Sequence, residues 1–398
     1  MRMKLATGLL ALLGAAAMAA TAAAATTVKV GVILTYSGPQ ATLGDQIDKG
    51  LKLYMQEHQH ELPPGVKIDL IRRDDTGPAP EVAKRLAQEL LTRDHVQILT
   101  GMAWTPNTAA ILPLSAQAKV PVVIMNATTA KLTRMSPYVI RTSCTLWQTS
   151  VPIGNWAAKQ GWKTAATAVS DFAPGHDAEA AFTKGFTDAG GKVVSSVRFP
   201  VINSDFVPFL QRIKDRKPDV LYIFVPSGPE ATAVMKAYND LGMAAAGIHL
   251  VGPQDLVPDY EIPNMGNAPL GLVTSGYYSR DATRPANKAF VAAWTKAYGA
   301  KSIPDFMAVG GWDGMAAIFD LVKATKGKFT GEQAVQFLSH WKKPHSPRGP
   351  IAIDPATRDI VQDIYIRRIE KKGGRLADVE FATIKDVKDP WKELNPEK

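Results

Sequence analysis

The stretch "VKVGVILTYSGPQATLGDQIDKGLKLYMQE" (residues 28–57) shows the pattern on which the rest of the chain is built. It opens with an apolar run rich in β-branched residues, which is typical of a buried strand. The loop "TYSGPQ" (35–40) follows, and a helical pattern begins soon after it. Small and polar residues at a strand-to-helix junction often contact a ligand. The stretch therefore predicts a strand–loop–helix unit whose loop lies at a binding site.

The same alternation continues along the chain. The runs "VKIDLI" (66–71), "VQILTG" (96–101) and "PVVIMN" (121–126) resemble strands, and helical patterns lie between them. Alternation of this kind restarts after residue 145 and continues to about residue 277. It predicts parallel sheets that are covered by helices on both faces and joined by right-handed crossovers. We therefore expect an α/β fold with two Rossmann-like lobes.

The last part of the chain has a different pattern. Three consecutive helical patterns end near residue 341, and "DPATRD" (354–359) then looks like the turn of a β-hairpin. Helices without strands of their own must pack on a sheet that already exists, so this part is expected to cover the first lobe and then the second. The expected lobes comprise 25–145 plus about 278–345, and 146–277 plus about 346–398. The resulting chain crossings predict a hinge, with a ligand cleft between the lobes.

Composition limits the function classes. The chain has 398 residues and a formal net charge of +9, and 46 % of its residues are apolar, enough for a full core. Its basic residues are scattered rather than clustered, which argues against nucleic-acid binding. The single cysteine, Cys144, cannot form an internal disulfide and is expected to be a small buried residue. We expect a soluble monomer.

Residues 1–24 are expected to be a secretory signal peptide. Arg2 and Lys4 precede a short apolar segment, and the alanines up to Ala24 suit cleavage. An N-terminal membrane anchor is the alternative, disfavoured because small residues follow the apolar segment. A cleaved signal predicts a periplasmic location.

Ligands of open parallel sheets bind beyond the carboxyl ends of the strands, so the loops after the strands predict the site. Thr105 and Thr128 lie near expected helix starts, where hydroxyl and N–H groups can hold an anion such as a carboxylate. Trp104 can stack on the rest of the ligand. Taken singly, each residue is explained equally well as part of a turn or of the core, but together the loops favour a site. The candidates in these loops are Ser37, Gly38, Ala103, Trp104, Thr105, Asn126, Ala127, Thr128, Asp171, Pro174, Ser227 and Gln254.

No catalytic or cofactor motif accompanies these loops. The sequence has no G-x-S-x-G elbow, no H-E-x-x-H and no G-x-G-x-x-G. The only close pair of histidines, in "HQH" (58–60), faces two directions on a helix and does not suggest a metal site. We therefore expect a binding protein that is not an enzyme and that uses no metal or cofactor.

Several segments together resemble the Leu/Ile/Val-binding-protein family. They are the opening stretch, "RDDTGPAPEVAKRLAQEL" (73–90), "MNATTAKLT" (125–133) and "VSDFAPGHDAEAAF" (169–182). The family comprises periplasmic substrate-binding proteins of ABC importers with a type I two-lobed fold. The resemblance implies a protein that closes on a small ligand and delivers it to a membrane permease. Extracellular receptors and cytoplasmic amide regulators with the same fold are an alternative, which the signal sequence disfavours.

The resemblance also assigns roles to residues. In amino-acid binders the matching loops grip the α-carboxylate, which here implies Ala103, Trp104, Thr105, Ala127 and Thr128.

Three departures from the amino-acid binders affect the expected ligand. Gln254 replaces the acidic residue that pairs with the ligand's ammonium, although Asp255 beside it keeps an amino acid possible. Leu43 and Pro174 stand where aromatic residues are common. The sequence is thus similar to the members that bind aromatic acids. Branched-chain or other amino acids are the second choice, and short amides the third.

Three aromatic side chains could line a ring in such a ligand. They are Trp104, Phe172 and Trp147.

Overall fold

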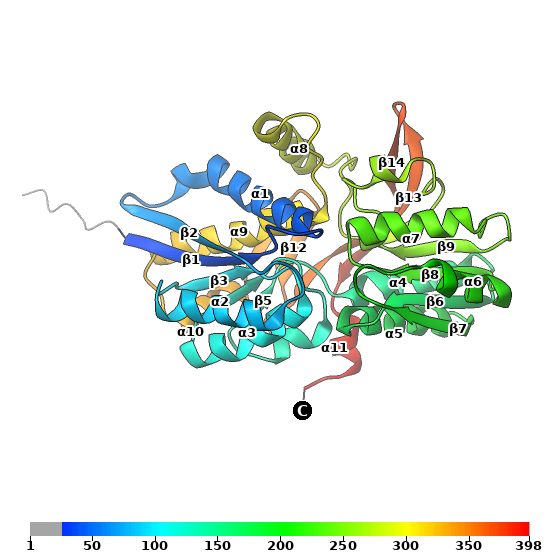
Figure 1. Ribbon diagram of the computed structural model, residues 1–398. Coiled ribbons are helices and arrows are strands. Elements are labelled where there is room, and N and C mark those ends of the chain that lie inside the picture. Colours follow the sequence, from blue (N-terminus) through cyan, green and yellow to red (C-terminus); the bar gives the residue numbers. More distant parts are fainter. Residues whose placement is uncertain (1–25, 398) are drawn as a thin grey trace, which may run out of the picture.

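The computed structural model describes residues 26–397 and shows two α/β lobes side by side (Figure 1). The expected signal peptide and its cleavage site lie outside these residues. Within them, the first lobe is built on a five-stranded parallel sheet of order β2-β1-β3-β4-β5. Its strands are β1 (Thr26–Leu34), β2 (Val66–Asp74), β3 (Ile98–Gly101), β4 (Val122–Ile124) and β5 (Val139–Arg141).

Helices cover both faces of this first sheet. Three of them come from the N-terminal part of the chain, and α8, α9 and α10 return to it from much later (Figure 1). The return of these helices confirms the expectation that they pack on a sheet already formed. The bounds are α1 (Ala41–His58), α2 (Pro80–Thr92), α3 (Thr105–Ala118), α8 (Pro285–Tyr298), α9 (Phe306–Thr325) and α10 (Gly331–Leu338), with short 3₁₀ turns η1 (Gln59–Glu61) and η2 (Ala130–Arg134).

The second lobe is built on a mixed sheet of order β11-β12-β13-β10-β9-β8-β6-β7, with β14 paired to β13. The strands β6 to β10 are parallel, whereas β11 to β14 run antiparallel to their neighbours. The strands are β6 (Thr164–Ser170), β7 (Lys192–Phe199), β8 (Val220–Phe224), β9 (His249–Pro253), β10 (Val273–Gly276), β11 (Lys342–Ser346), β12 (Gly349–Ile353), β13 (Ile360–Lys372) and β14 (Arg375–Val387).

The helices of the second lobe cover its parallel strands. They are α4 (Leu146–Lys159), α5 (Ala173–Asp188), α6 (Val207–Arg216), α7 (Pro229–Asp240), the turns η3 (Gln254–Leu256) and η4 (Ile262–Met265), and the C-terminal α11 (Pro390–Leu394). Gly190 and Gly242 follow α5 and α7 with φ of 91° and 60°, the left-handed conformation that ends many helices.

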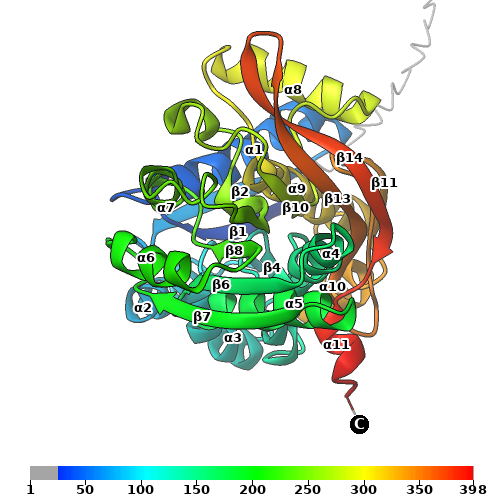
Figure 2. The ribbon, with the colours of Figure 1, turned by 90° about the vertical axis from the view of Figure 1, so that its right-hand side faces the viewer.

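The predicted turn at 354–359 joins β12 to β13, which pair antiparallel as expected. The sequence analysis did not predict that β13 continues into a second, longer hairpin with β14. This hairpin curves along one side of the molecule (Figure 2). Many side chains of β14 are exposed and lack a strict alternation, so the apolar pattern that reveals a strand is weak there.

The helices α1 and α9 of the first lobe pack with their backbones close together. A Cβ atom at Gly50 would lie 1.9 Å from the carbonyl oxygen of Ala308, and one at Gly311 would lie 2.1 Å from that of Ile47. Backbone oxygens cannot move aside as a flexible side chain can. This contact fixes α9, whose N-terminus reaches the cleft, against the sheet that carries the first-lobe loops.

We expect Gly50→Ala to lower the free energy of unfolding by about 1–3 kcal/mol, because an added methyl group overpacks this contact. The better helix propensity of alanine, worth up to about 1 kcal/mol, offsets only part of that loss. Urea denaturation followed by circular dichroism measures it. Gln56→Ala, at an exposed position of the same helix, is the control. An unchanged midpoint for Gly50→Ala would show that α1 and α9 can move apart without lowering the free energy of unfolding.

Candidate functional site

A pocket lies between the two lobes, beyond the carboxyl ends of strands from both sheets. The space between its walls, counted together with the open solvent at its mouth, is about 390 Å³. Its walls come from loops and helix starts that are distant in sequence. The lining residues are Leu43, Ala103, Trp104, Thr105, Asn126, Thr128, Phe172, Pro174, Phe224, Pro226, Ser227, Asp255 and Met307.

A buried hydrogen-bond network positions the first-lobe wall. The indole N–H of Trp104 donates to Thr35 Oγ1 over 2.9 Å, and that hydroxyl donates to Asp75 over 2.7 Å. The side chain of Asn107, in the first turn of α3, donates to the other oxygen of Asp75. The network ties the ends of β1 and β2 to the start of α3. It holds the ring of Trp104 and the first turn of the helix in fixed positions beside the pocket.

The start of α3 presents unused donors. The helix begins at Thr105 with Trp104 as its N-cap. The first N–H groups of a helix have no acceptor within it. The hydroxyl of Thr105 is also buried without a hydrogen-bond partner among the described residues, although it borders the pocket. A ligand carboxylate there would accept from these groups.

A second first-lobe loop approaches from the end of β4. The side-chain amide of Asn126 donates to the carbonyl oxygen of Ala103 over 2.9 Å, which joins the two loops. Thr128 follows and borders the pocket with only 8 % of its surface exposed. The two loops therefore bring the side chains of Thr105 and Thr128 to one pocket.

The second lobe contributes an aromatic wall. Phe172, the N-cap residue of α5, stacks on Phe224 at the end of β8 with ring centroids 6.1 Å apart. Pro226 and Ser227 continue the wall, and the Ser227 hydroxyl donates to the carbonyl oxygen of Asp255. This side of the pocket offers flat apolar surface, which suits an aromatic ring.

Gln254 and Asp255 differ sharply in where their side chains lie. The carbonyl oxygen of the Gln254 side chain accepts from the backbone N–H of Tyr277 over 3.0 Å, and the residue does not line the pocket. Its side chain instead joins η3 to the chain that leaves β10. Asp255 lines the pocket, and burial raises the pKa of its carboxyl to about 7. Of these two candidates from the sequence, only Asp255 lines the pocket.

Other expected residues also lie away from the pocket lining. Ser37 and Gly38 are exposed, and Ala127 is buried in the core beneath the loop. Trp147 packs against Ala130 and Ala181 rather than beside the pocket.

The structure adds lining residues that the sequence analysis missed. Phe224 is the last residue of β8 and Pro226 directly precedes the candidate Ser227, so both adjoin a loop that the sequence had already marked. Met307 has no such signal, because only the fold brings the start of α9 to the cleft.

The two lobes touch across the cleft. The backbone N–H of Ala130 in the first lobe donates to Asp177 of α5 over 2.9 Å. At the pocket rim, a Cβ atom at Gly228 of the second lobe would lie 3.2 Å from Gln40 Oε1 and 3.7 Å from Leu43. The contacts leave the pocket narrow.

Comparison with known proteins identifies the class of molecule to which this architecture belongs. A family model described as "Periplasmic binding protein" matches residues 27–375. The chain belongs to the periplasmic binding protein family. This membership confirms the resemblance drawn from the sequence, and with it a two-lobed solute-binding fold that serves transport.

Solved structures similar to this periplasmic binding protein contain small aromatic acids. A solute-binding protein of an ABC transporter from Rhodopseudomonas palustris BisB5, in complex with 3,4-dihydroxybenzoic acid, is 47 % identical with a TM-score of 0.88. The match covers 92 % of this chain and 99 % of the other. One from strain HaA2 with p-hydroxybenzoic acid is 40 % identical, with the same coverage and a TM-score of 0.89.

Curated relatives have a different name. "Leu/Ile/Val-binding protein homolog 6" of Brucella melitensis is 41 % identical over 94 % of this chain and 95 % of its own length.

The family implies a periplasmic location. Among residues 26–397, no helix is both long and apolar enough to cross a membrane. The same residues contain no group of three or more potential metal ligands.

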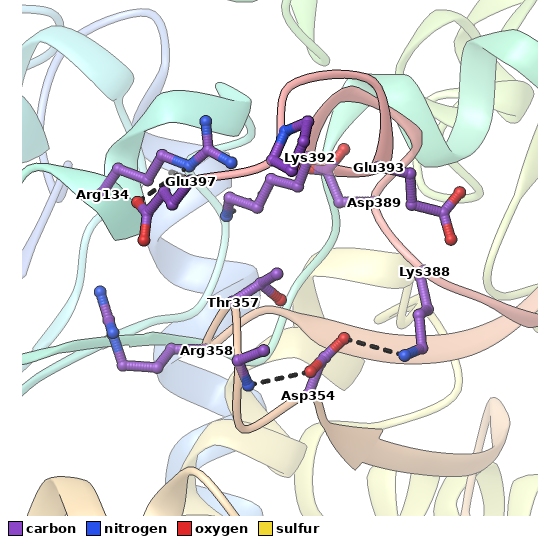
Figure 3. A pocket seen from close by; sticks show the side chains of 11 residues that line it. Arg134, Asp354, Thr357, Arg358, Lys388, Asp389, Lys392, Glu393 and Glu397 are labelled. Atoms are coloured by element: carbon purple, nitrogen blue, oxygen red, sulfur yellow. Dashed lines mark hydrogen bonds and ion pairs between the residues drawn. The ribbon is translucent and has the colours of Figure 1, made fainter.

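A second pocket of this periplasmic binding protein lies where the C-terminal segment meets η2 (Figure 3). Three of its four basic side chains form ion pairs, and the fourth, Arg358, donates to backbone carbonyl oxygens. Arg134 contacts Glu397 over 3.1 Å and Lys388 contacts Asp354 over 3.2 Å, while Lys392 pairs with the buried Asp359. Since these pairs cross from the C-terminal segment to other parts of the chain, they hold that segment in place.

Proposed function

We propose that this protein captures a small aromatic acid between its lobes in the periplasm and delivers it to the permease of an ABC importer. The observation that carries the proposal is the composition of the pocket. It combines the hydroxyls of Thr105 and Thr128 on one lobe with the stacked rings of Phe172 and Phe224 on the other. Hydroxyl and N–H donors suit a carboxylate, and the rings suit an aromatic body.

The similar proteins support the same ligand class, because relatives with 40–47 % identity are described with hydroxylated benzoic acids. We propose further that the protein works as a monomer, binds no nucleic acid, catalyses no reaction and loses residues 1–24 on export. The expected lobe boundaries, 25–145 plus about 278–345 and 146–277 plus about 346–398, remain our proposed division of the chain.

Asp255 supports a second candidate. A carboxylate in the pocket could pair with the ammonium of a branched-chain or other amino acid, which would restore the charge that Gln254 lacks. The curated relatives are named for such ligands. Arginine and lysine side chains do not line this pocket. The carboxylate of either ligand would therefore be bound by uncharged hydrogen-bond donors.

Calorimetry distinguishes the two candidates. The protein is first unfolded and refolded to remove any co-purified solute, and then titrated with benzoate, 4-hydroxybenzoate, 3,4-dihydroxybenzoate, leucine, isoleucine, valine and phenylalanine. We expect at least one aromatic acid to bind about tenfold or more tightly than every amino acid, because the rings of Phe172 and Phe224 suit a flat ring joined directly to a carboxylate, as in the ligands of the similar proteins. A submicromolar dissociation constant for an amino acid, with no binding of the benzoates, would reverse the ranking.

A further inference from the structure

The carboxyl of Asp255 is a buried acceptor without a donor from elsewhere in the described chain. It follows β9 within the short turn η3, and 9 % of the residue is exposed. Among residues 26–397, no residue forms a hydrogen bond or ion pair with this carboxyl. The positive charge of Arg367 lowers the pKa of this carboxyl, but Arg367 itself pairs with Asp378 over 2.7 Å.

Neighbouring acids are placed differently. Asp305 caps α9 by accepting from the N–H groups of Met307 and Ala308 over 2.9 and 3.2 Å, so it has a structural purpose. Asp171, in the loop after β6, is exposed and pairs with His176 over 2.7 Å. Asp255 alone among these three lines the pocket. A buried carboxyl that faces a pocket requires a donor, and the ligand can supply one.

The position of Asp255 restricts which ligand group can reach it. Thr105 and Thr128, the proposed carboxylate grip, belong to the first lobe, whereas Asp255 belongs to the second. A ligand carboxylate would be repelled by an ionised Asp255, so the carboxylate end of the ligand belongs at the threonines. The opposite end of the ring then meets Asp255 and must carry a hydrogen-bond donor.

We propose that Asp255 accepts a hydrogen bond from a ring hydroxyl of the ligand and thereby selects hydroxylated benzoic acids over benzoate. This inference rests on the proposed function and adds a specificity-determining residue to it. A site built to bond a hydroxyl discriminates strongly against an analogue that lacks it, because the acceptor then stays buried and unpaired. The expected preference for the hydroxylated acid is about tenfold or more.

The test compares benzoate with 3-hydroxybenzoate and 4-hydroxybenzoate by calorimetry on the full mature chain, in the wild type, Asp255→Ala and Asp255→Asn. In the wild type, at least one hydroxybenzoate is expected to bind about tenfold more tightly than benzoate. In Asp255→Ala that preference is expected to fall to about twofold or less, while benzoate itself keeps its affinity or gains. Asp188→Asn removes an exposed carboxylate of α5 that pairs with Lys184 away from the pocket, and it is expected to leave every value unchanged.

The outcomes separate this inference from the proposed function. Equal binding of benzoate and both hydroxybenzoates by the wild type would overturn the role of Asp255 while leaving an aromatic-acid binder. A preference that survives in Asp255→Ala would overturn that role as well. If that variant does not fold, Asp255→Asn decides, because its neutral amide oxygen accepts a weaker hydrogen bond and is expected to show a smaller preference than the wild type. If none of the three benzoates binds, the proposed function as an aromatic-acid-binding protein is itself contradicted.

Discussion

Replacing Arg348 by methionine is expected to lower the free energy of unfolding by about 3–5 kcal/mol, since one partner of a fully buried ion pair would be lost. Arg348 lies in the turn between β11 and β12, and its side chain is completely buried with that of Asp313. Its Nε atom donates to Asp313 over 2.8 Å. The substitution would leave the carboxylate of Asp313 in a dry environment with Ser346 as its remaining hydrogen-bond donor.

Arg348 also joins the chain segments that cross between the lobes. Its guanidinium donates to the carbonyl oxygens of Thr142 and Ser143, where the chain first passes to the second lobe. It lies 4.4 Å from the ring centroid of Tyr277, where the chain passes back. Arg348 itself lies just after the third crossing, where the chain leaves α10 of the first lobe and enters β11. One side chain thus holds the crossings together, so we expect its loss to loosen the hinge as well as the core.

Urea denaturation monitored by tryptophan fluorescence measures the loss. Arg85→Met is the matched control, because that arginine is 61 % exposed and pairs with Glu89 on the surface of α2. Surface pairs contribute about 0–1 kcal/mol, so the control is expected to unfold near the wild-type midpoint. Equal midpoints for the two variants would mean that the buried cluster contributes no more than a surface pair.

Removing the two pocket hydroxyls is expected to weaken binding of the best aromatic acid about 100-fold or more. Thr105→Val and Thr128→Val each keep the side-chain shape and delete one donor. A hydrogen bond to a charged group contributes about 1.5–3 kcal/mol, so each single variant is expected to lose about tenfold or more. The buried Thr105 hydroxyl has no partner in the described chain, so its removal need not destabilise the protein.

Titration calorimetry of the single and double variants measures these losses. Thr295→Val is the control, because its hydroxyl donates to the carbonyl oxygen of Val291 on the surface of α8, away from the pocket. Unchanged affinity in the double variant would show that the carboxylate binds elsewhere and that both threonines serve only their turns. Thermal unfolding without ligand verifies that each variant remains folded.

Local patterns in the sequence determined the architecture. The alternation of apolar runs with helical patterns requires parallel sheets, because strands joined by helices cannot form tight hairpins. Glycine is favoured at residues 190 and 242, because the chain has a positive φ there, just after the ends of α5 and α7. The loops containing Trp104, Asn126 and Ser227 could be placed at one cleft, because parallel strands end at the same sheet edge.

Only the tertiary structure decided which side chains reach the pocket. Gln254 and Asp255 are adjacent, and the turn η3 directs the first toward Tyr277 and the second toward the cleft. Met307 reaches the pocket because α9 packs against Gly50, more than 200 positions away in the chain. Local propensity sets where a strand ends, but the direction of a loop side chain depends on turn dihedrals and on long-range packing, and neither leaves a periodic signal in the sequence.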